Sequence, residues 1–255
     1  MSIKNQIILF LASTIVALAV IYIMFIRSVK VNNVPIRQPS IAITDNGIAI
    51  AFEKDLFIEA DIDMGRDDKI IKYFCDGLRL YVIVESDRIN DLLFSKFTLS
   101  TQDGSVSRVA DEMYQLDKSE LVVIWNDSKI DSDLLYRLSA KLKSQGTLIS
   151  DTFTIQSLAT SHIQVDKDYG DIRINSITMA DTSVLIDLSY NSLKSVGGFQ
   201  IEWDKVVDNG RIISSTEKNF QIIFPVNVDS KSSFTLYLND QNGFIMSTIP
   251  VDLSK

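Results

Sequence analysis

Residues 7–26 constrain this chain more than any other stretch, because they read IILFLASTIVALAVIYIMFI and contain no charged residue. At about 1.5 Å of rise per residue, a helix of this length spans roughly 30 Å, the thickness of the hydrocarbon core of a bilayer. Apolar side chains cover such a helix on all sides and leave no polar stripe for solvent. The sequence therefore predicts a transmembrane helix at residues 7–26 that contacts the lipid bilayer, preceded by a short tail at residues 1–6.

A cleaved signal peptide is the main alternative to an anchor. The apolar run is longer than the roughly 7–15 residues of a signal-peptide core. Its C-terminal exit reads FIRSVKVNN, with bulky and charged residues where a signal peptidase needs small side chains. We therefore expect an uncleaved signal-anchor. Pro35 and Pro39 disfavour helix at the residues before them, which predicts an extended juxtamembrane stalk over residues 27–39.

Two signals for the orientation of this single-pass anchor oppose each other. Arg27, Lys30 and Arg37 follow the apolar run and Lys4 precedes it, so the positive-inside rule favours a cytoplasmic C-terminal side. Strand-rich modules on one N-terminal anchor are more typical of the extracytoplasmic side, and the single Cys75 fits either compartment. We expect a cell inner (plasma) membrane protein with its bulk in the periplasm, and a cytoplasmic bulk remains the alternative.

The charge of the chain limits its partners. Its 255 residues carry a net charge of −8, and the only charges among the first thirty residues are the basic Lys4, Arg27 and Lys30. The body beyond the anchor is therefore more acidic than the whole chain. Nucleic acid and anionic headgroups repel such a surface, so no nucleic-acid partner is expected.

Residues 40–160 are expected to form a first β-rich module. The segment Ile41–Phe52 alternates around Asn46-Gly47 and predicts a hairpin. A second hairpin is predicted from Lys69–Phe74 and Leu78–Val84 around Asp76-Gly77. One helix is predicted near residues 131–145, because five apolar residues share a helical face and Gly146 can end it. These five are Ile130, Leu134, Leu135, Leu138 and Leu142.

Residues 168–255 show a different pattern, in which short segments of alternating apolar and polar residues are separated by turn residues. Seven strands over this length are the count and spacing of an immunoglobulin-like β-sandwich. The candidates are Ile172–Ile177, Val184–Tyr190, Phe199–Trp203, Arg211–Ser214, Phe220–Phe224, Phe234–Leu238 and Phe244–Ile249. The chain as a whole is predicted to be mainly β (α+β overall). A transmembrane helix is followed by two tandem β-sandwich-like modules, the first with a helical insertion.

A faint internal repeat connects the two modules. The segment DIDMGRDDKII at 61–71 resembles DKDYGDIRI at 166–174, and each is followed by a strand, a turn and an alternating strand. In this alignment Leu78 is equivalent to Val184, and Leu80 is equivalent to Ile186. Two related modules are one interpretation, and chance similarity between strand–turn–strand segments is the other.

The same segments contain the sharpest candidate for a metal site. Asp61 and Asp63 precede Gly65, and Asp166 and Asp168 precede Gly170. Alternate carboxylates before a glycine can bind Ca²⁺, but an EF-hand needs a third oxygen ligand where each glycine stands and a Glu at position twelve. Lys72 and Ile177 occupy that twelfth position. We therefore interpret both segments as solvated acidic turns and predict no metal and no cofactor.

No catalytic residue is predicted. His162 is the only histidine, and SLATSHIQV around it resembles no nucleophile elbow. Ser215 and Lys218 match S-x-x-K, but in a polar loop, where such matches arise by accident. Cys75 is expected to be half-buried and inert. Trp125 and Trp203 lie in apolar segments and are expected in the core.

These observations favour a non-enzymatic membrane protein whose β-rich ectodomain mediates protein–protein interaction in an envelope assembly. The expected partner is another membrane or envelope protein, bound at an exposed edge strand. One alternative is an extracytoplasmic sensor that binds a small or lipid-like ligand. The other is a membrane-tethered hydrolase using carboxylates such as Asp61, Asp63, Asp67 or Asp68.

Overall fold

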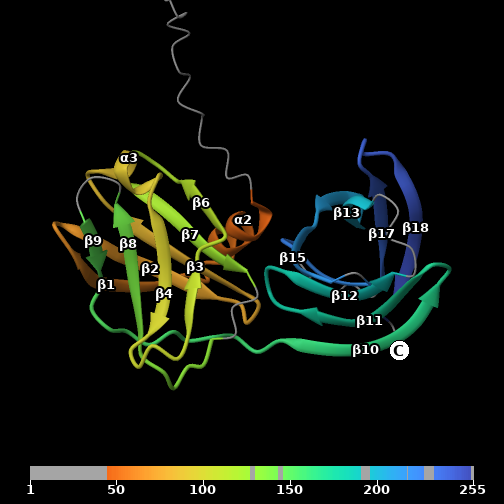
Figure 1. The fold of residues 1–255 in the computed structure, drawn as a ribbon, viewed down its shortest axis with the longest axis horizontal. Coiled ribbons are helices and arrows are strands. Elements are labelled where there is room, and N and C mark those ends of the chain that lie inside the picture. The colour runs from red at the N-terminus through yellow and green to blue at the C-terminus, as the bar shows by residue number, and fades with distance from the viewer. Residues whose placement is uncertain are drawn as a thin grey trace, which may run out of the picture. The chain divides into compact units, whose positions relative to one another are not determined.

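The computed structural model describes residues 45–126, 130–142, 146–190, 196–216, 218–226 and 233–253. This part of the chain is mainly β, with four sheets and two short helices (Figure 1). The helix predicted at 7–26, the stalk at 27–39 and residues 41–44 of the first predicted hairpin lie outside it. None of the helices in the described ranges has the length and apolarity needed to cross a membrane.

The first half of the described chain contains helices α2 (Asn46–Glu53) and α3 (Ile89–Leu92) and nine strands. These strands are β1 (Ile58–Gly65), β2 (Asp68–Cys75), β3 (Arg79–Glu85), β4 (Lys96–Thr101), β5 (Ser107–Val109), β6 (Glu112–Gln115), β7 (Glu120–Asn126), β8 (Tyr136–Leu142) and β9 (Gly146–Ile149). They form two sheets, in the orders β1-β2-β3-β7-β6 and β5-β4-β8-β9. One apolar core lies between these sheets, with residues such as Val82 and Val123 from the first and Leu99 and Leu138 from the second.

The second half contains nine further strands. They are β10 (Ser161–Tyr169), β11 (Ile172–Met179), β12 (Val184–Tyr190), β13 (Val196–Trp203), β14 (Val206–Asn209), β15 (Arg211–Ser215), β16 (Asn219–Phe224), β17 (Ser233–Asp240) and β18 (Ile245–Asp252). Their sheets have the orders β10-β11-β12-β16-β15 and β14-β13-β17-β18. A second core joins residues such as Ile186 and Ile222 to Ile201 and Leu236 of the facing sheet.

The two halves repeat the same topology. Adding nine to each strand number of the first half gives the strand orders of the second half without exception. The register of the corresponding hairpins also aligns them, because the pair next to the turn is Cys75 with Leu80 in β2–β3 and Met179 with Val184 in β11–β12. Leu80 thus corresponds to Val184, and the sequence alignment that set Leu78 against Val184 was displaced by two residues.

The hairpin predicted at Ile41–Phe52 is wrong in its described part, because Asn46–Glu53 forms helix α2. Asp45 caps this helix by accepting a hydrogen bond from the amide of Ile48 at 3.2 Å. The helix packs Ile48 and Ala51 on the outer face of the first sheet, against Tyr81 and other apolar residues. Strand β3 is buried on both faces, so that outer face needs a cover, and α2 supplies it.

The helix predicted near residues 131–145 is also wrong. Tyr136–Leu142 forms strand β8, in which Tyr136, Leu138, Ala140 and Leu142 are buried in strict alternation. The same leucines fit a helical spacing, but pairing with β4 and β9 completes a sheet over the first core. Tertiary pairing therefore overrides the local helical pattern, and the first module has no helical insertion there.

Most other predicted strands are confirmed. The second hairpin is formed by β2 and β3, and all seven strands predicted after residue 168 are present. Two strands of the second half, β10 and β14, were not predicted. Strand β10 spans residues 161–169 and pairs with β11, so the second pair of sheets begins at Ser161, not after the interval 161–167 that the sequence analysis left between its modules.

Candidate interaction edge and polar junction

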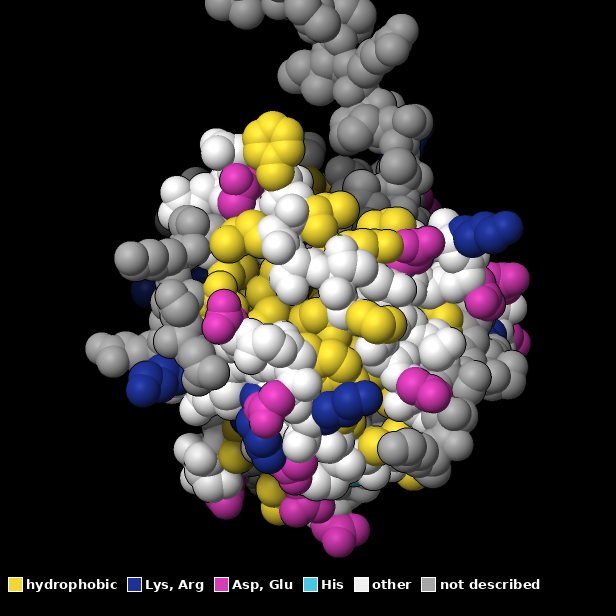
Figure 2. Space-filling model, turned by 90° about the vertical axis from the view of Figure 1, so that its right-hand side faces the viewer, with side chains coloured by type: hydrophobic (Ala, Val, Ile, Leu, Met, Phe, Trp, Pro, Cys, Tyr) yellow, Lys and Arg dark blue, Asp and Glu magenta, His cyan; other side chains and the backbone are white. Residues whose placement is uncertain are grey.

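Strand β18 is the last strand of its sheet and exposes apolar side chains at its beginning. Phe244, Ile245 and Met246 are 72%, 58% and 44% exposed. Met246 is the extra residue of a bulge, because Ser247 pairs with Leu238 and Ile245 with Asn239. Figure 2 shows hydrophobic side chains gathered in the middle of this side of the molecule, with acidic and basic side chains around them.

The lack of charge along most of β18 distinguishes it from the other long edge strands, β1 and β10. Ile245–Val251 contains no charged residue. The long edge strands β1 and β10 instead carry charges such as Asp61, Asp63, Asp166 and Asp168, and both contain bulges. Charges and bulges protect edges against pairing with another chain. Strand β18 has the bulge, but its only charged residue is Asp252 at its end.

The corresponding edge of the first half is shorter and closed. Strand β9 takes the place of β18 there and has four residues. Just after it, the amide of Asp151 donates a hydrogen bond to the carbonyl oxygen of Asp63 at 3.0 Å, which ties the end of this strand to β1. In the second half, β10 is the counterpart of β1. Within the described part of β18, the hydrogen-bonded neighbour is β17. Of these two corresponding edges, as far as the structure describes them, β18 is therefore the longer, with eight residues against four.

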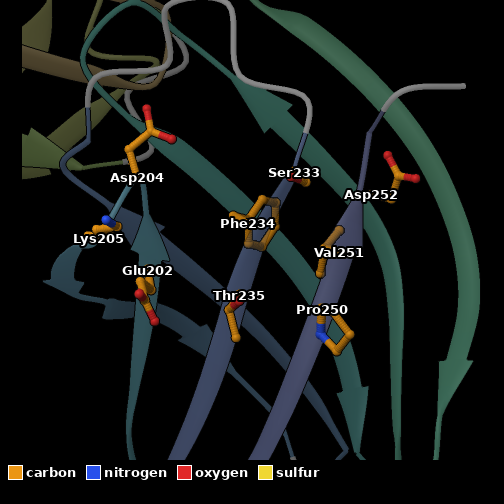
Figure 3. A pocket seen from close by; sticks show the side chains of 9 residues that line it. All are labelled: Glu202, Asp204, Lys205, Ser233, Phe234, Thr235, Pro250, Val251 and Asp252. Atoms are coloured by element: carbon orange, nitrogen blue, oxygen red, sulfur yellow. The ribbon is translucent and has the colours of Figure 1, made fainter.

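An open hollow of about 590 Å³ lies at the end of β18 (Figure 3). Its lining includes Glu202, Asp204 and Asp252, together with Lys205. Glu202 and Pro250 flank Thr235 in neighbouring strands, so the hollow extends over the outer face of the sheet. Tyr237 on this face donates a hydrogen bond to Glu202, and this contact raises the pKa of Tyr237. Among the described residues of the lining, three carboxylates stand beside one ammonium, so this part of the hollow is mainly acidic.

A buried polar cluster surrounds Arg79 at the start of β3. Its guanidinium contacts Asp45, Glu112 and Asn126, with Nη2 at 2.6 Å from Asp45 Oδ2 and Nε at 2.8 Å from Asn126 Oδ1. Burial alone acts to lower the pKa of Arg79, but the neighbouring negative groups raise it overall. Burial also raises the pKa of Tyr81, so its hydroxyl stays protonated. The cluster is built of satisfied, paired charges.

This cluster borders a set of contacts between the two halves. Arg211 of β15 pairs with Glu112 at 2.8 Å. The buried Asp76 accepts hydrogen bonds from the hydroxyls of Thr182 and Ser183, at 2.6 and 2.7 Å, and from the amides of Leu78 and Arg79. A small apolar group formed by Leu78, Ala180 and Ile223 lies beside them. Hydrogen bonds and ion pairs therefore form much of this junction.

The predicted acidic turns have basic partners on the adjacent strand. Asp61 pairs with Lys69 at 2.8 Å, and this hydrogen bond raises the pKa of Lys69. In the second half, Arg173 pairs with Asp168 and Asp166 at 3.2 and 3.3 Å. The described ranges contain no group of three or more His, Cys, Asp or Glu side chains placed to hold a metal ion.

The remaining residues considered from sequence are dispersed. His162 is exposed on β10 beside Thr178. Ser215 is the exposed last residue of β15, and Lys218 is exposed just before β16. Asp67 lies exposed in a turn, whereas Asp68 is buried and paired with Arg88. Cys75 is fully buried, not half-buried as expected, whereas Trp125 and Trp203 are in the cores as predicted.

Sequence reasoning missed the Arg79 cluster. Its signal was one arginine at the start of an otherwise apolar strand, at a position where an unpaired charge would be costly. The partners Asp45, Glu112 and Arg211 are far apart in sequence and only the fold brings them together.

Comparison of the chain with models of known protein families and with curated protein sequences finds no match. The chemistry of the described residues therefore has to support any functional proposal by itself.

Proposed function

We propose that this chain is a non-enzymatic, single-pass membrane protein whose two β-sandwich modules bind another membrane or envelope protein through strand β18. The observation that carries the proposal is the uncharged, open edge from Ile245 to Val251, with exposed apolar residues at its beginning. The immunoglobulin-like character of the second module and the anchor at residues 7–26 belong to this proposal.

Strand addition explains how such an edge would bind. An extended segment of the partner pairs with the main chain of β18, and each net hydrogen bond contributes about 0.5–1.5 kcal/mol. The segment also buries part of Phe244, Ile245 and Met246, which gives affinity through the hydrophobic effect. Pro250 has no amide hydrogen, so the added strand would run along residues 245–249.

The alternatives have different structural requirements. A ligand carrier needs a deep, mainly apolar cavity, and the hollow beside β18 is open and acidic. A hydrolase needs converging carboxylates, whereas Asp61 and Asp68 bind Lys69 and Arg88, respectively. These contacts favour protein binding over the two alternatives. The periplasmic side of an inner membrane is the location that we propose for it from the sequence.

Site-specific photocrosslinking of the full chain in its native membrane tests this function. A photoreactive residue replaces Thr248, which is exposed on β18, and the matched control replaces Thr147, which is exposed on the corresponding strand β9. We expect one discrete adduct, identified by mass spectrometry, from position 248 and none from position 147. In the chain with the photoreactive residue at position 248, the additional substitutions Ile245→Lys or Met246→Pro should abolish the adduct, and the thermal melting temperature should stay unchanged.

Two results contradict the proposal. One is an adduct of equal yield from both positions, which would reflect unspecific proximity in the membrane. The other is an adduct at position 248 that persists in the folded Ile245→Lys variant, which would show that pairing at this edge is not needed.

A further inference from the structure

The outer face of the sheet β5-β4-β8-β9 is basic, although the whole chain carries a net charge of −8. Lys96 of β4 and Arg137 and Lys141 of β8 are exposed and alternate with buried residues, so their side chains point away from the first core. The remaining outward positions of these four strands hold uncharged residues. They are Thr98, Ser100, Ser107, Val109, Ser139, Thr147 and Ile149. The described strands therefore present three cations and no carboxylate on this face.

Two of these cations are direct neighbours across the strands. Lys96 stands opposite Lys141 in the register of β4 with β8. Side chains in such a pair have Cβ atoms about 4.5–5.5 Å apart, and like charges there are destabilising. Neither lysine forms an ion pair within the described ranges. The undescribed residues 143–145 read Lys-Ser-Gln and contain no acidic side chain. The sheet thus keeps a repulsive pair that no described side chain neutralises.

The corresponding face of the second half shows that the strand order does not require these cations. Strands β13 and β17 take the places of β4 and β8 there. Their outward cross-strand pairs are Gln200 with Tyr237 and Glu202 with Thr235. These positions contain one carboxylate and neither lysine nor arginine. The basic face is therefore a feature of the side chains of the first half and not of its topology.

Acidic side chains flank this face beyond the ends of its strands. Asp91 lies in α3 before β4, Asp103 follows β4, and Asp151 follows β9. The carboxylate of Asp103 already accepts hydrogen bonds from the amide and the hydroxyl of Ser105, at 3.0 and 2.8 Å. The strands themselves thus present positive charge, which selects an anionic partner that lies flat on the sheet.

We propose that the outer face of the β5-β4-β8-β9 sheet docks on the anionic headgroups of the bilayer that holds the predicted anchor at residues 7–26. This inference rests on the membrane anchoring in the proposed function and adds to it a second binding surface. The net charge of the chain predicts repulsion from such headgroups, and this face is the exception, because its strands gather cations alone. Hydroxyl groups between the cations, such as those of Thr98 and Ser100, can donate hydrogen bonds to phosphate oxygens.

The spacing and the surroundings of the cations favour a bilayer over an acidic protein segment. Exposed cations attract a single counter-charge only weakly, but a tether keeps the headgroups at a high effective concentration. Arg137 and Lys141 are roughly 14 Å apart along β8, at about 3.4 Å per residue, so the charges are spread over several headgroups. Val109 and Ile149 on the same face are 46% and 58% exposed and can contact the apolar boundary beneath the headgroups.

Fluorescence of the full chain in lipid nanodiscs tests this inference. An environment-sensitive fluorophore is attached to the variant Thr147→Cys, because Thr147 is exposed and pairs with Lys141. Cys75 is buried and stays unlabelled in the folded protein. Discs of phosphatidylcholine are compared with discs of equal parts of phosphatidylcholine and phosphatidylglycerol. In the anionic discs the emission should shift to the blue and rise about twofold or more, and added salt should reverse the change.

Neutralisation of the lysine pair is the decisive variant. Lys96→Gln combined with Lys141→Gln should abolish most of the response to phosphatidylglycerol, and the melting temperature should stay unchanged or rise, because a repulsive pair is removed. The matched control combines Lys118→Gln with Lys167→Gln, at exposed positions away from this face, and should keep the response. A fluorophore at Thr248→Cys, on the corresponding strand of the second half, should not respond to the lipid.

The outcomes separate the docking from the function on which it rests. A response at position 147 that is the same in uncharged discs, or that survives in the folded double variant of the lysine pair, overturns docking by charge and leaves binding at β18 untouched. Elution of the chain apart from the discs in size-exclusion chromatography overturns the anchor and both proposals with it. Binding of a fluorescein-labelled hexaglutamate peptide that the double variant loses, without any response to phosphatidylglycerol, would identify an acidic protein segment as the occupant and overturn docking on the bilayer.

Discussion

The guanidinium of Arg79 donates two hydrogen bonds to the carboxylate of Asp45, from Nη1 at 2.9 Å and from Nη2 at 2.6 Å. Asp45 caps helix α2, and Arg79 begins strand β3. One buried ion pair therefore joins the helix that covers the first sheet to a central strand of that sheet. Both side chains are inaccessible to solvent, so their pairing is decisive for stability.

Replacing Arg79 with methionine should destabilise the protein strongly. The substitution leaves the buried carboxylates of Asp45 and Glu112 without their shared cation, at a cost of about 3–5 kcal/mol. Urea unfolding of residues 31–255 would measure this loss. The control Arg137→Met, at an exposed position of β8, should change the free energy of unfolding by no more than about 0.5 kcal/mol. Similar losses in both variants would show that the buried pair has no special role.

The second half should fold on its own if β10 is included. Its core draws on residues from Ile172 to Val251 and is separate from the first core. We expect residues 161–255 to unfold cooperatively in urea, and residues 168–255 to be markedly less stable, because they lose most of the pairing of β10 with β11. Circular dichroism would follow the unfolding of both fragments. An unfolded 161–255 fragment beside a folded 45–255 fragment would show that the two halves form one folding unit.

The full chain should remain in the membrane fraction after a high-pH carbonate wash. We predict from the sequence that the twenty uncharged residues at 7–26 form a membrane-spanning helix, and the bilayer would hold such a helix far more strongly than a peripheral contact. Deletion of residues 1–30 should release a soluble acidic protein. Immunoblotting of the pellet and the supernatant provides the measurement, and full-length chain in the supernatant would contradict the anchor.

Calcium should leave thermal stability unchanged. The carboxylates of the two acidic turns already pair with Lys69 and Arg173, and the turns lack a complete set of oxygen ligands. Calorimetric melting with millimolar calcium and with chelator should therefore give the same midpoint. A substantial upward shift that Asp61→Asn or Asp166→Asn abolishes would reveal a site.

The turn after β4 should contribute stability that is lost in acid. Hydrogen bonds from Thr101 and Ser105 lower the pKa of Asp103 from 3.8 to about 2. The folded state therefore favours the ionised carboxylate. This contribution is complete above the unfolded pKa and is lost as the pH falls from 3.8 towards 2. An NMR titration would locate the midpoint, and Asp103→Asn should remove this part of the acid dependence; a midpoint near 4 would contradict the prediction.

Part of the fold is readable in local sequence patterns. The β2–β3 hairpin follows from apolar alternation on either side of Asp76-Gly77, and Gly77 has a φ of +92°, which suits a glycine. The strands of the second half follow from the same two-residue period. Such patterns are local, because alternation specifies which side of a strand faces the core wherever that core lies.

The secondary structure of two short apolar segments was decided by their surroundings in the fold. Ile48 and Ile50 fit a strand pattern but belong to a helix, because the outer face of β3 must be covered. Leu138 and Leu142 fit a helix but belong to a strand, because β4 and β9 provide pairing on both sides. Short apolar runs are compatible with both structures until neighbours supply hydrogen bonds or a face to cover.

The sequence by itself determined the uncharged stretch at residues 7–26, the acidic body and most of the strands, since these depend on the order of residues along the chain. Only the tertiary structure decided that Arg79, Asp45 and Glu112 meet, that the two halves share one strand order, and that β18 is an edge. These features depend on which distant strands pair, and the free energy of that pairing is set by the whole core and not by any local pattern.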